Sequence, residues 1–310
     1  MSRQDADVSG LLLLDKPSGI TSHDAVARAR RWLKTRRVGH AGTLDPMATG
    51  LLTLCIGQAT RLVEYLAGRD KRYTAVVQLG VATNTDDAEG QALERRTVPA
   101  IGDAMLEELR LRFTGELMQT PPQFSAIKKD GVRSYARARQ GETFELAARS
   151  VIIYSLVFER DPSDASLLRM EVHCGSGTYI RALARDIGTM LGCGAHLAAL
   201  RRTAVGDLSV NDALTTERAE ELAGTGLIAR ELRPADEALA DAPSFRLDAA
   251  GAQSICRGQF VRVDPDVSAE VCRVYGPGGR FVAVGTVAAG VLRPVKVLVA
   301  EDDAAGPIVS

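Results

Sequence analysis

The sequence lacks the features that mark disulfide-rich and metal-binding proteins. Its 310 residues include five cysteines, which are scattered, odd in number and never form a C-x-x-C pair. This usage argues against both a disulfide framework and a zinc site. There are only four histidines, and no two of them have a metal-ligand spacing on one helix face. We therefore expect no metal and a reducing compartment.

Long hydrophobic runs are missing as well. The longest uncharged apolar stretch, residues 281–292, is interrupted by two glycines. It is too short for a membrane span, which needs roughly 20 residues. The N-terminal segment MSRQDADVSG carries two aspartates and no apolar core, so it does not look like a secretory signal. We expect a cytoplasmic protein that does not associate with membranes.

An excess of one charge sign is absent from the chain as a whole. It holds 38 Lys and Arg against 39 Asp and Glu, a formal net charge of −1. Residues 1–210, however, hold 28 basic and 24 acidic side chains, a net of +4, and residues 211–310 hold 10 and 15, a net of −5. The near-zero total is thus a cancellation, and it does not exclude RNA binding by the first 210 residues.

Several motifs of phosphate and acyl chemistry are also absent. The chain has no G-x-x-x-x-G-K-[ST] and no G-x-S-x-G, and the G-S-G at 175–177 lacks the third glycine of a dinucleotide fingerprint. This G-S-G is more typical of a turn from a strand into a helix. These observations exclude the commonest nucleotide-binding and serine-hydrolase patterns.

The hydrophobic pattern predicts an α+β protein of two domains. Apolar or alternating runs predict strands at 11–14, 51–56, 73–79, 151–159 and 167–174, the last two as a pair. Helices are predicted at 23–34, with Thr21 or Ser22 as N-cap, at 102–112 and at 178–191. Because strands and helices do not alternate regularly, a mixed sheet is favoured over a doubly wound one. Short apolar runs after residue 240, separated by glycine-rich turns, predict a small β-rich C-terminal domain.

One loop-like segment is the best candidate for catalysis. Residues 39–50 (GHAGTLDPMATG) lie between two predicted apolar segments, and Asp45 precedes a proline that favours extended backbone. A carboxylate mounted in this way suits a nucleophile or base. An Asp-Pro pair alone is more often a simple turn, so the catalytic interpretation depends on the whole segment.

Two dense basic runs flank this segment in the sequence. Residues 24–40 contain six Arg or Lys and one Asp, and residues 126–139 contain five Arg or Lys and one Asp. Such runs are often only solvated surface. Two of them near one candidate site also fit phosphate contacts to RNA.

A collinear set of motifs resembles the tRNA pseudouridine synthase B family. The matching pieces include LLLLDKPSG at 11–19, GHAGTLDP at 39–46, KRY at 71–73, SAIK at 125–128, GTYIR at 177–181 and LRR at 200–202. They cover about residues 10–205 in the family's order. The resemblance implies a pseudouridine synthase fold with a mixed, largely antiparallel sheet over residues 1–235. This part includes an RNA-clamping insertion at about 81–150. A looser match implies a PUA-like RNA-binding domain over 240–310.

The resemblance also implies roles for individual residues. Asp45 matches the catalytic nucleophile, Tyr73 the tyrosine that packs on the target base and is a candidate for proton transfer, and Arg181 the arginine that pairs with the aspartate. We expect this arginine to lower the pKa of Asp45. Four further matches imply substrate binding: His40, Tyr179, Leu200 and Lys16. The phosphate contacts expected from the basic runs are Arg36, Arg37, Lys128, Lys129 and Arg133.

The implied activity is isomerisation of uridine 55 in the T-loop of tRNA, with base flipping and without a cofactor. The expected partner is the tRNA T-arm, bound by a monomer that needs no protein partner, with a tRNA-folding chaperone role also open. Two other enzymes remain alternatives: a guide-RNA-dependent synthase and a carboxylate-dependent hydrolase. The hydrolase would need a second acid beside Asp45, for which Asp15, Asp86 and Asp87 are candidates.

Overall fold

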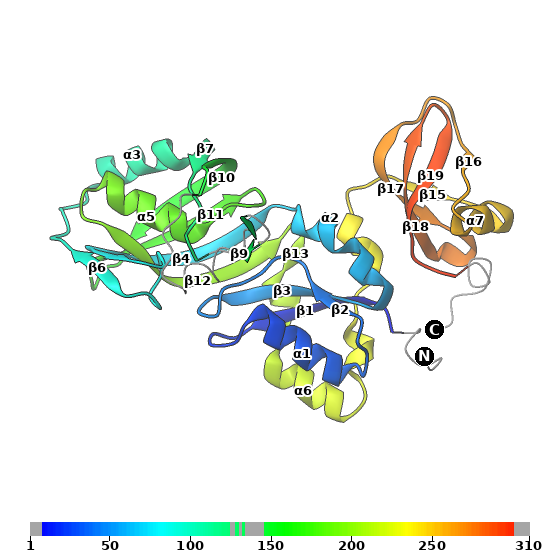
Figure 1. Cartoon of the computed structure of the whole chain (residues 1–310), viewed down its shortest axis with the longest axis horizontal. Helices are drawn as coiled ribbons and strands as arrows, with labels where there is room; N and C mark the ends of the chain where they lie inside the picture. Colours follow the sequence, from blue (N-terminus) through cyan, green and yellow to red (C-terminus); the bar gives the residue numbers. More distant parts are fainter. Residues whose placement is uncertain (1–7, 125–127, 130–131, 134–145, 301–310) are drawn as a thin grey trace.

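Two β-sheets organise the computed structural model, which describes residues 8–124, 128–129, 132–133 and 146–300. A ten-stranded sheet occupies most of the chain, and a separate five-stranded sheet follows it (Figure 1). The candidate catalytic segment belongs to the larger sheet, whose construction therefore decides the geometry of the site.

The large sheet is mixed and mostly antiparallel. Its main path runs β14-β1-β3-β12-β4-β11-β10-β7, with β13 paired to β12 and β2 to β3. Only β1 with β14 and β3 with β12 are parallel pairs, which confirms the predicted fold class. The strands are β1 (Gly10–Lys16), β2 (Val38–His40), β3 (Thr49–Ile56), β4 (Lys71–Leu79), β7 (Gly115–Gln119), β10 (Arg149–Arg160), β11 (Leu167–Cys174), β12 (Ala195–Val205), β13 (Leu208–Ser209) and β14 (Leu214–Thr215).

Burial patterns explain why this sheet is covered unevenly. The continuous apolar runs of β1 and β3 are buried on both faces: Leu12 and Leu14 pack into one hydrophobic cluster, and Leu11 and Leu13 into another. In contrast, β4 alternates buried and more exposed residues, as expected for a strand with one face in contact with solvent. The sheet is therefore sandwiched at β1 and β3 and open on one face at β4.

Four of the five α-helices of this part pack into the larger cluster, and the short helix at 63–67 packs into the smaller one. The α-helices are α1 (Ser22–Trp32), α2 (Val63–Ala67), α3 (Asp103–Phe113), α5 (Ile180–Met190) and α6 (Thr216–Gly224). Short 3₁₀ turns are η2 (Gly57–Leu62), η3 (Val210–Asp212), η4 (Ile228–Glu231) and η5 (Ala235–Leu239). Helix α1 begins with a capping box between Thr21 and Asp24 and lies beside α6 (Figure 1).

The second sheet forms the β-rich C-terminal part that the sequence predicts. Its order is β15-β17-β18-β19-β16. The elements are β15 (Ser244–Arg246), α7 (Ala249–Cys256), β16 (Val261–Arg262), β17 (Ala269–Tyr275), η6 (Pro277–Gly279), β18 (Phe281–Ala288) and β19 (Val291–Val297). Helix α7 packs on β18 and β19.

An apolar cluster joins the two sheets. Val284 and Leu298 of the C-terminal part share this cluster with Leu62, Leu66 and Leu239 of the N-terminal part. Polar contacts surround it: Lys296 Nζ lies 2.7 Å from Glu64 Oε1, the Tyr275 hydroxyl donates to Asp236 over 2.5 Å, and Arg61 donates to the carbonyl of Val297. The C-terminal sheet is thus packed on the elements η2, α2 and η5.

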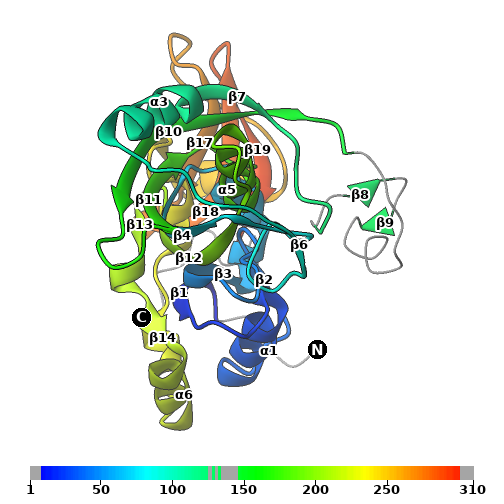
Figure 2. The same cartoon turned by 90° about the vertical axis from the view of Figure 1, so that its left-hand side faces the viewer.

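The predicted insertion at 81–150 is described in part. It contains the hairpin of β5 (Val81–Thr83) and β6 (Ala92–Arg95), helix α3, strand β7 and the start of β10. The short strands β8 (Lys128–Lys129) and β9 (Val132–Arg133) pair with each other and stand away from the main sheet (Figure 2). Residues 125–127, 130–131 and 134–145, which include Ser125 of a family motif, lie outside the described residues. None of the described helices is long and apolar enough to cross a membrane.

Candidate active site

The loop between β2 and β3 presents Asp45 at the edge of the helix-covered face. Ser22, the first residue of α1, exchanges two hydrogen bonds with Leu44: the Leu44 N–H donates to Ser22 Oγ over 2.9 Å, and this hydroxyl donates to the Leu44 carbonyl over 3.1 Å. Leu44 and Ala48 are buried on either side of the aspartate. The backbone is therefore fixed while the Asp45 side chain stays 35% exposed.

The Arg202 side chain binds backbone carbonyls at the start of this loop and in β3, which follows the loop. Its side chain is buried, and its donors reach three carbonyls: Nε to Leu51 over 2.7 Å, Nη2 to Gly42 over 3.0 Å and Nη1 to Thr43 over 3.5 Å. No carboxylate of the described residues forms an ion pair with it. In the sequence Arg202 is only part of a family motif, and no local pattern predicts this contact, which pairs residues about 150 positions apart.

Lys16 lies beneath the same loop. Its Nζ is buried and donates to the carbonyls of Pro17 and Ile20 over 2.8 Å each and of Pro46 over 3.2 Å. Burial lowers the pKa of Lys16 to about 8, although the negative charge of Asp45 acts against this. The structure thus places Lys16 as a support for the loop that carries Asp45.

Arg181 brings two aspartates together. From the first turn of α5 its Nε lies 3.0 Å from Asp45 Oδ2 and its Nη1 lies 3.1 Å from Asp87 Oδ2. The same guanidinium donates to the carbonyls of Thr85 over 3.0 Å and Phe124 over 2.9 Å. The Arg181 side chain is 6% exposed, and its Nη2 donates to Asp45 Oδ1 over 3.4 Å.

Asp87 is the partner of Arg181 that the sequence did not predict. The hydrolase alternative considered it as a second acid, but the structure places it behind Arg181, where its Oδ1 accepts from Thr85 Oγ1 over 2.5 Å and from the Glu89 N–H over 3.1 Å. Asp15 pairs instead with Arg201 over 2.7 Å. No local sequence pattern predicts that Asp87 pairs with Arg181, because the two residues are 94 positions apart.

Two opposing effects act on the charge of Asp45. Burial raises the pKa of the Asp45 carboxyl, the positive charge of Arg181 opposes this rise, and the negative charge of Asp87 adds to it. The expected lowering by Arg181 is therefore present but is smaller than the effect of burial. The carboxylate is held in one orientation by a neighbouring guanidinium in a site that disfavours its ionised form.

Tyr73 lies on β4 beside this pair. It is 9% exposed and belongs to the large hydrophobic cluster, and its backbone pairs with that of Arg202 on β12. Burial raises the pKa of the Tyr73 phenol, whereas the positive charge of Arg202 acts in the opposite direction. Tyr73 therefore offers a neutral aromatic ring close to the Asp45 charge.

The other three predicted substrate-binding residues lie at the end of β2, at the start of α5 and on β12. His40 ends β2, its ring meets that of His23 edge-on at 5.6 Å, and its Nδ1 has no partner among the described residues. Burial lowers the pKa of His40. Tyr179 caps α5, where Gln119 holds its backbone N–H and carbonyl, and Leu200 lies on β12.

The predicted phosphate contacts are described only in part. Arg36 and Arg37 are exposed in the turn between α1 and β2, and Arg37 donates to Gln58 Oε1 over 3.0 Å. The backbones of Lys128, Lys129 and Arg133 belong to β8 and β9, and the structure does not describe their side chains.

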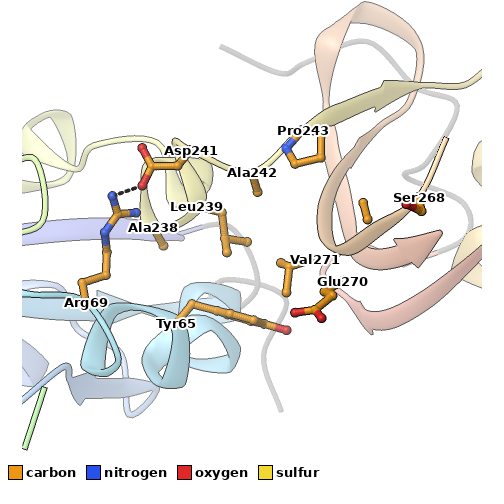
Figure 3. A pocket seen from close by; sticks show the side chains of 11 residues that line it. Tyr65, Arg69, Ala238, Leu239, Asp241, Ala242, Pro243, Ser268, Glu270 and Val271 are labelled. Atoms are coloured by element: carbon orange, nitrogen blue, oxygen red, sulfur yellow. Dashed lines mark hydrogen bonds and ion pairs between the residues drawn. The ribbon is translucent and has the colours of Figure 1, made fainter. Parts of the chain in front are cut away.

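A crevice elsewhere in the molecule holds none of these residues. It lies at the junction of the two sheets and is lined by Tyr65, Arg69, Asp241, Glu270 and Val271, among others (Figure 3). Arg69 pairs there with Asp241 of the segment that connects the sheets. In the described part of the chain, no group of three His, Cys, Asp or Glu side chains is arranged to hold a metal ion.

Comparisons with known proteins agree on one family. A model of the N-terminal domain of TruB family pseudouridylate synthases matches residues 30–180. A model of the tRNA pseudouridylate synthase B C-terminal domain matches 181–240, and one of the pseudouridine synthase II TruB C-terminal region matches 243–298. Together these models span more than half of the chain.

Curated relatives and solved structures give the same result. A protein of Cupriavidus metallidurans named tRNA pseudouridine synthase B is 45% identical over 303 residues, which cover 94% of this chain and 95% of that protein. A protein of the same name from Leifsonia xyli is 52% identical over 235 residues, 74% of this chain and 76% of its own. One solved structure, described as an H/ACA RNP bound to a substrate RNA containing 2'-deoxyuridine, shares the fold. Its TM-score is 0.72 at 22% identity, over 94% of this chain and 86% of that one.

Proposed function

Because the chain belongs to the TruB family of pseudouridylate synthases, an isomerase family, we propose that it converts uridine 55 in the T-loop of tRNA to pseudouridine. The observation that carries this proposal is the ion pair between Asp45 and Arg181, which holds a carboxylate beside a buried aromatic ring. Curated relatives that match nearly their whole length are named for action on tRNA, which supports tRNA as the substrate.

In the proposed reaction the Asp45 carboxylate is the nucleophile. It attacks the flipped nucleotide at ribose C1′ or at uracil C6, and the bond formed to Asp45 later breaks and frees the carboxylate. The two routes share one net outcome. The N1–C1′ bond breaks, a C5–C1′ bond forms, the proton of C5 is released and N1 gains a proton. No oxidant, reductant or external group is consumed. Only the ionised carboxylate can attack, which is why its pairing with Arg181 matters.

The neighbouring residues receive the substrate in this proposal. A uracil inside the stacked T-loop is out of reach, so it must be flipped out and bound against an aromatic surface. Tyr73 supplies that surface, and stacking of this kind contributes roughly 1–3 kcal/mol per base. Burial raises the pKa of the Tyr73 phenol, so the ring stays neutral against the base, and the phenol is also a candidate for proton transfer. Tyr179 and Leu200 line the pocket, His40 helps to hold the T-loop, and Lys16 supports the loop.

The remainder of the T-arm is bound by the basic surface. Arg36 and Arg37 on the turn after α1, with Lys128, Lys129 and Arg133 of the insertion, contact backbone phosphates. Residues 240–310 act as a PUA-like RNA-binding domain beside the catalytic domain of residues 1–235. The protein works as a monomer without an obligatory protein partner, in the cytoplasm where its tRNA substrate resides.

A tritium-release assay tests the substrate and the position. Transcripts of tRNA labelled with tritium at C5 of uridine lose the label when C5 bonds to the ribose. We expect release from the wild-type transcript and none from a transcript in which U55 is replaced by cytidine. Release that persists after this replacement would refute the assignment of position 55.

Substitution of Asp45 tests the chemistry. Asp45→Asn keeps the size and most hydrogen bonds of the side chain but removes the nucleophilic charge. We expect unchanged tRNA binding in a filter assay and no detectable pseudouridine. A variant that forms product at the wild-type rate would remove Asp45 from the mechanism. Bare tRNA with no other protein is the substrate in both assays, so activity there also excludes a guide-RNA requirement.

A second role as a tRNA-folding chaperone is compatible with the same binding surface. Cells that carry Asp45→Asn in place of the wild-type gene separate the two roles, because this variant binds but does not catalyse. If folding assistance matters, we expect these cells to outgrow a full deletion. Equal growth of the two strains at elevated temperature and in competition would refute the chaperone role.

A further inference from the structure

Helix α5 carries a second arginine one turn after Arg181, and its contacts repeat those of Arg181. Arg185 Nη1 lies 2.8 Å from Asp86 Oδ2, and Nη2 donates to the carbonyl of Thr120 over 2.8 Å. Its Nε also donates to Asp186 Oδ1 on the same helix over 2.9 Å. Arg181 binds the next aspartate, Asp87, and the carbonyl of Phe124. Each arginine thus joins one residue of an aspartate pair to one carbonyl of the segment 119–124.

The aspartate pair adopts an uncommon backbone that gives these contacts their direction. Asp86 has φ +60°, a left-handed conformation that costs most residues energy but that Asp and Asn tolerate. Its carbonyl accepts from the Leu197 N–H over 3.0 Å, so β12 anchors the backbone while Arg185 anchors the side chain. With the turn held at Asp86, the following Asp87 is directed at Arg181.

The segment 119–124 is attached to α5 at three successive points. The Gln119 side chain exchanges hydrogen bonds with the backbone of Tyr179, Arg185 binds the Thr120 carbonyl and Arg181 binds the Phe124 carbonyl. Arg185 is the middle attachment, and its side chain is 28% exposed, whereas that of Arg181 is 6% exposed. Arg185 has no contact with Asp45, and any effect on Asp45 must pass through these two segments.

We propose that Arg185 is a positioning residue for the reaction: by holding Asp86 and the Thr120 carbonyl, it fixes the two segments that orient Arg181 toward Asp45. This inference rests on the proposed function of the Asp45 site and adds a determinant outside the substrate pocket. Without Arg185 the Asp86–Asp87 turn and the carbonyl at Phe124 can shift relative to α5. A displacement of about 1 Å in a catalytic group can cost on the order of 100-fold in rate.

The test compares Arg185→Gln with a control on another helix. Arg218 forms an exposed ion pair with Glu221 on α6 over 2.9 Å, so Arg218→Gln removes a comparable charge far from the site. We would measure pseudouridine formation in single turnovers at saturating tRNA, tRNA affinity by filter binding, and thermal unfolding. For Arg185→Gln we expect a rate lower by about tenfold or more, with affinity within about threefold of wild type. Arg218→Gln should match wild type in rate.

Four further measurements separate positioning from mere stabilisation. Arg185→Lys keeps the charge near Asp86 and should recover part of the rate. The acid limb of the rate profile should move to higher pH in Arg185→Gln, because a loosened Arg181 opposes the raised pKa of Asp45 less; the charges acting on Asp45 are Arg181, Asp87 and Lys16. In the Asp86→Asn variant, the asparagine can adopt the same left-handed backbone conformation, so only the carboxylate charge is lost. It should lower the rate too, and its combination with Arg185→Gln should cost little more than Arg185→Gln alone.

The outcomes are distinct. A wild-type rate in folded Arg185→Gln, or a loss confined to tRNA affinity or to melting temperature, would overturn the positioning role. If Arg185→Gln does not fold, Asp86→Asn decides: a wild-type rate there overturns the inference, and a reduced rate with unchanged affinity supports it. Failure of wild-type protein to make pseudouridine on tRNA would refute the proposed function itself.

Discussion

At the scale of single residues, the site combines one half-buried carboxylate with buried cations that support it. Lys16 and Arg202 donate hydrogen bonds to backbone carbonyls of the Asp45 loop and its flanks. Arg181 contacts Asp45, Asp87 and two further carbonyls. Buried cations without a nearby carboxylate cost stability. Here they give the loop a fixed shape, and the positive charge of Arg181 partly offsets the rise in the Asp45 pKa that burial causes.

The ionisation of Asp45 leads to a prediction on pH. Burial raises the pKa of this carboxyl above its ordinary value of 3.8, and a protonated carboxyl cannot attack. The single-turnover rate should therefore fall as the pH is lowered, with a midpoint above 3.8. Quenched single turnovers between pH 4 and 8 measure it, with circular dichroism to establish that the fold persists. A rate that stays flat to pH 4 in folded protein would contradict the raised pKa.

At the scale of elements, local pattern predicted most of the fold. The expected helix at 23–34 is α1 (Ser22–Trp32), capped at Thr21, and the expected pair at 151–159 and 167–174 is the antiparallel pair of β10 and β11. These elements follow from periodicity and capping, which are read within a few residues. The parallel pairing of β3 with β12, by contrast, joins residues about 150 positions apart, and no local signal specifies it.

The same reasoning explains which site residues could be predicted. Asp45, Tyr73 and Arg181 are found through family motifs, and the structure brings Asp45 to Arg181 over 3.0 Å. The partners Asp87 and Arg202 act through ion pairs and backbone contacts between distant segments. Such contacts depend on the tertiary fold, so composition and spacing could not reveal them.

The close approach of β3 and β12 leads to a prediction on Gly50. It has φ +99°, and a Cβ there would lie 2.2 Å from the Arg202 carbonyl oxygen. Gly50→Ala should therefore lower the free energy of unfolding by about 3 kcal/mol, through backbone strain and overpacking. Urea denaturation measures this. Gly224→Ala, in the last position of α6 with open space around it, serves as control and should be neutral or slightly stabilising. Equal stabilities of the two variants would contradict the tight approach.

At the scale of the whole molecule, the distribution of charge separates the chain into two parts, whereas hydrophobic packing joins its two sheets. Charge separates residues 1–210, with a net of +4, from residues 211–310, with a net of −5. Packing, however, joins the two sheets, because Val284 and Leu298 share an apolar cluster with Leu62 and Leu66. An apolar junction of this kind favours a fixed arrangement over independent domain motion. In the proposed function, the two sheets would then meet the tRNA as a single body.

The apolar junction leads to a prediction on cooperativity. Wild-type protein should unfold in one thermal transition, because separating the sheets exposes a shared core. Leu298 is 5% exposed at the junction. Leu298→Ala should lower the free energy of unfolding by about 2–3 kcal/mol. It should also speed proteolysis of the connecting residues 240–243. Val295→Ala removes an apolar side chain that is 53% exposed and should stay within about 0.5 kcal/mol of wild type. Calorimetry and limited elastase digestion measure both. Two resolved transitions in wild-type protein would show that the sheets fold separately and that the shared cluster contributes little.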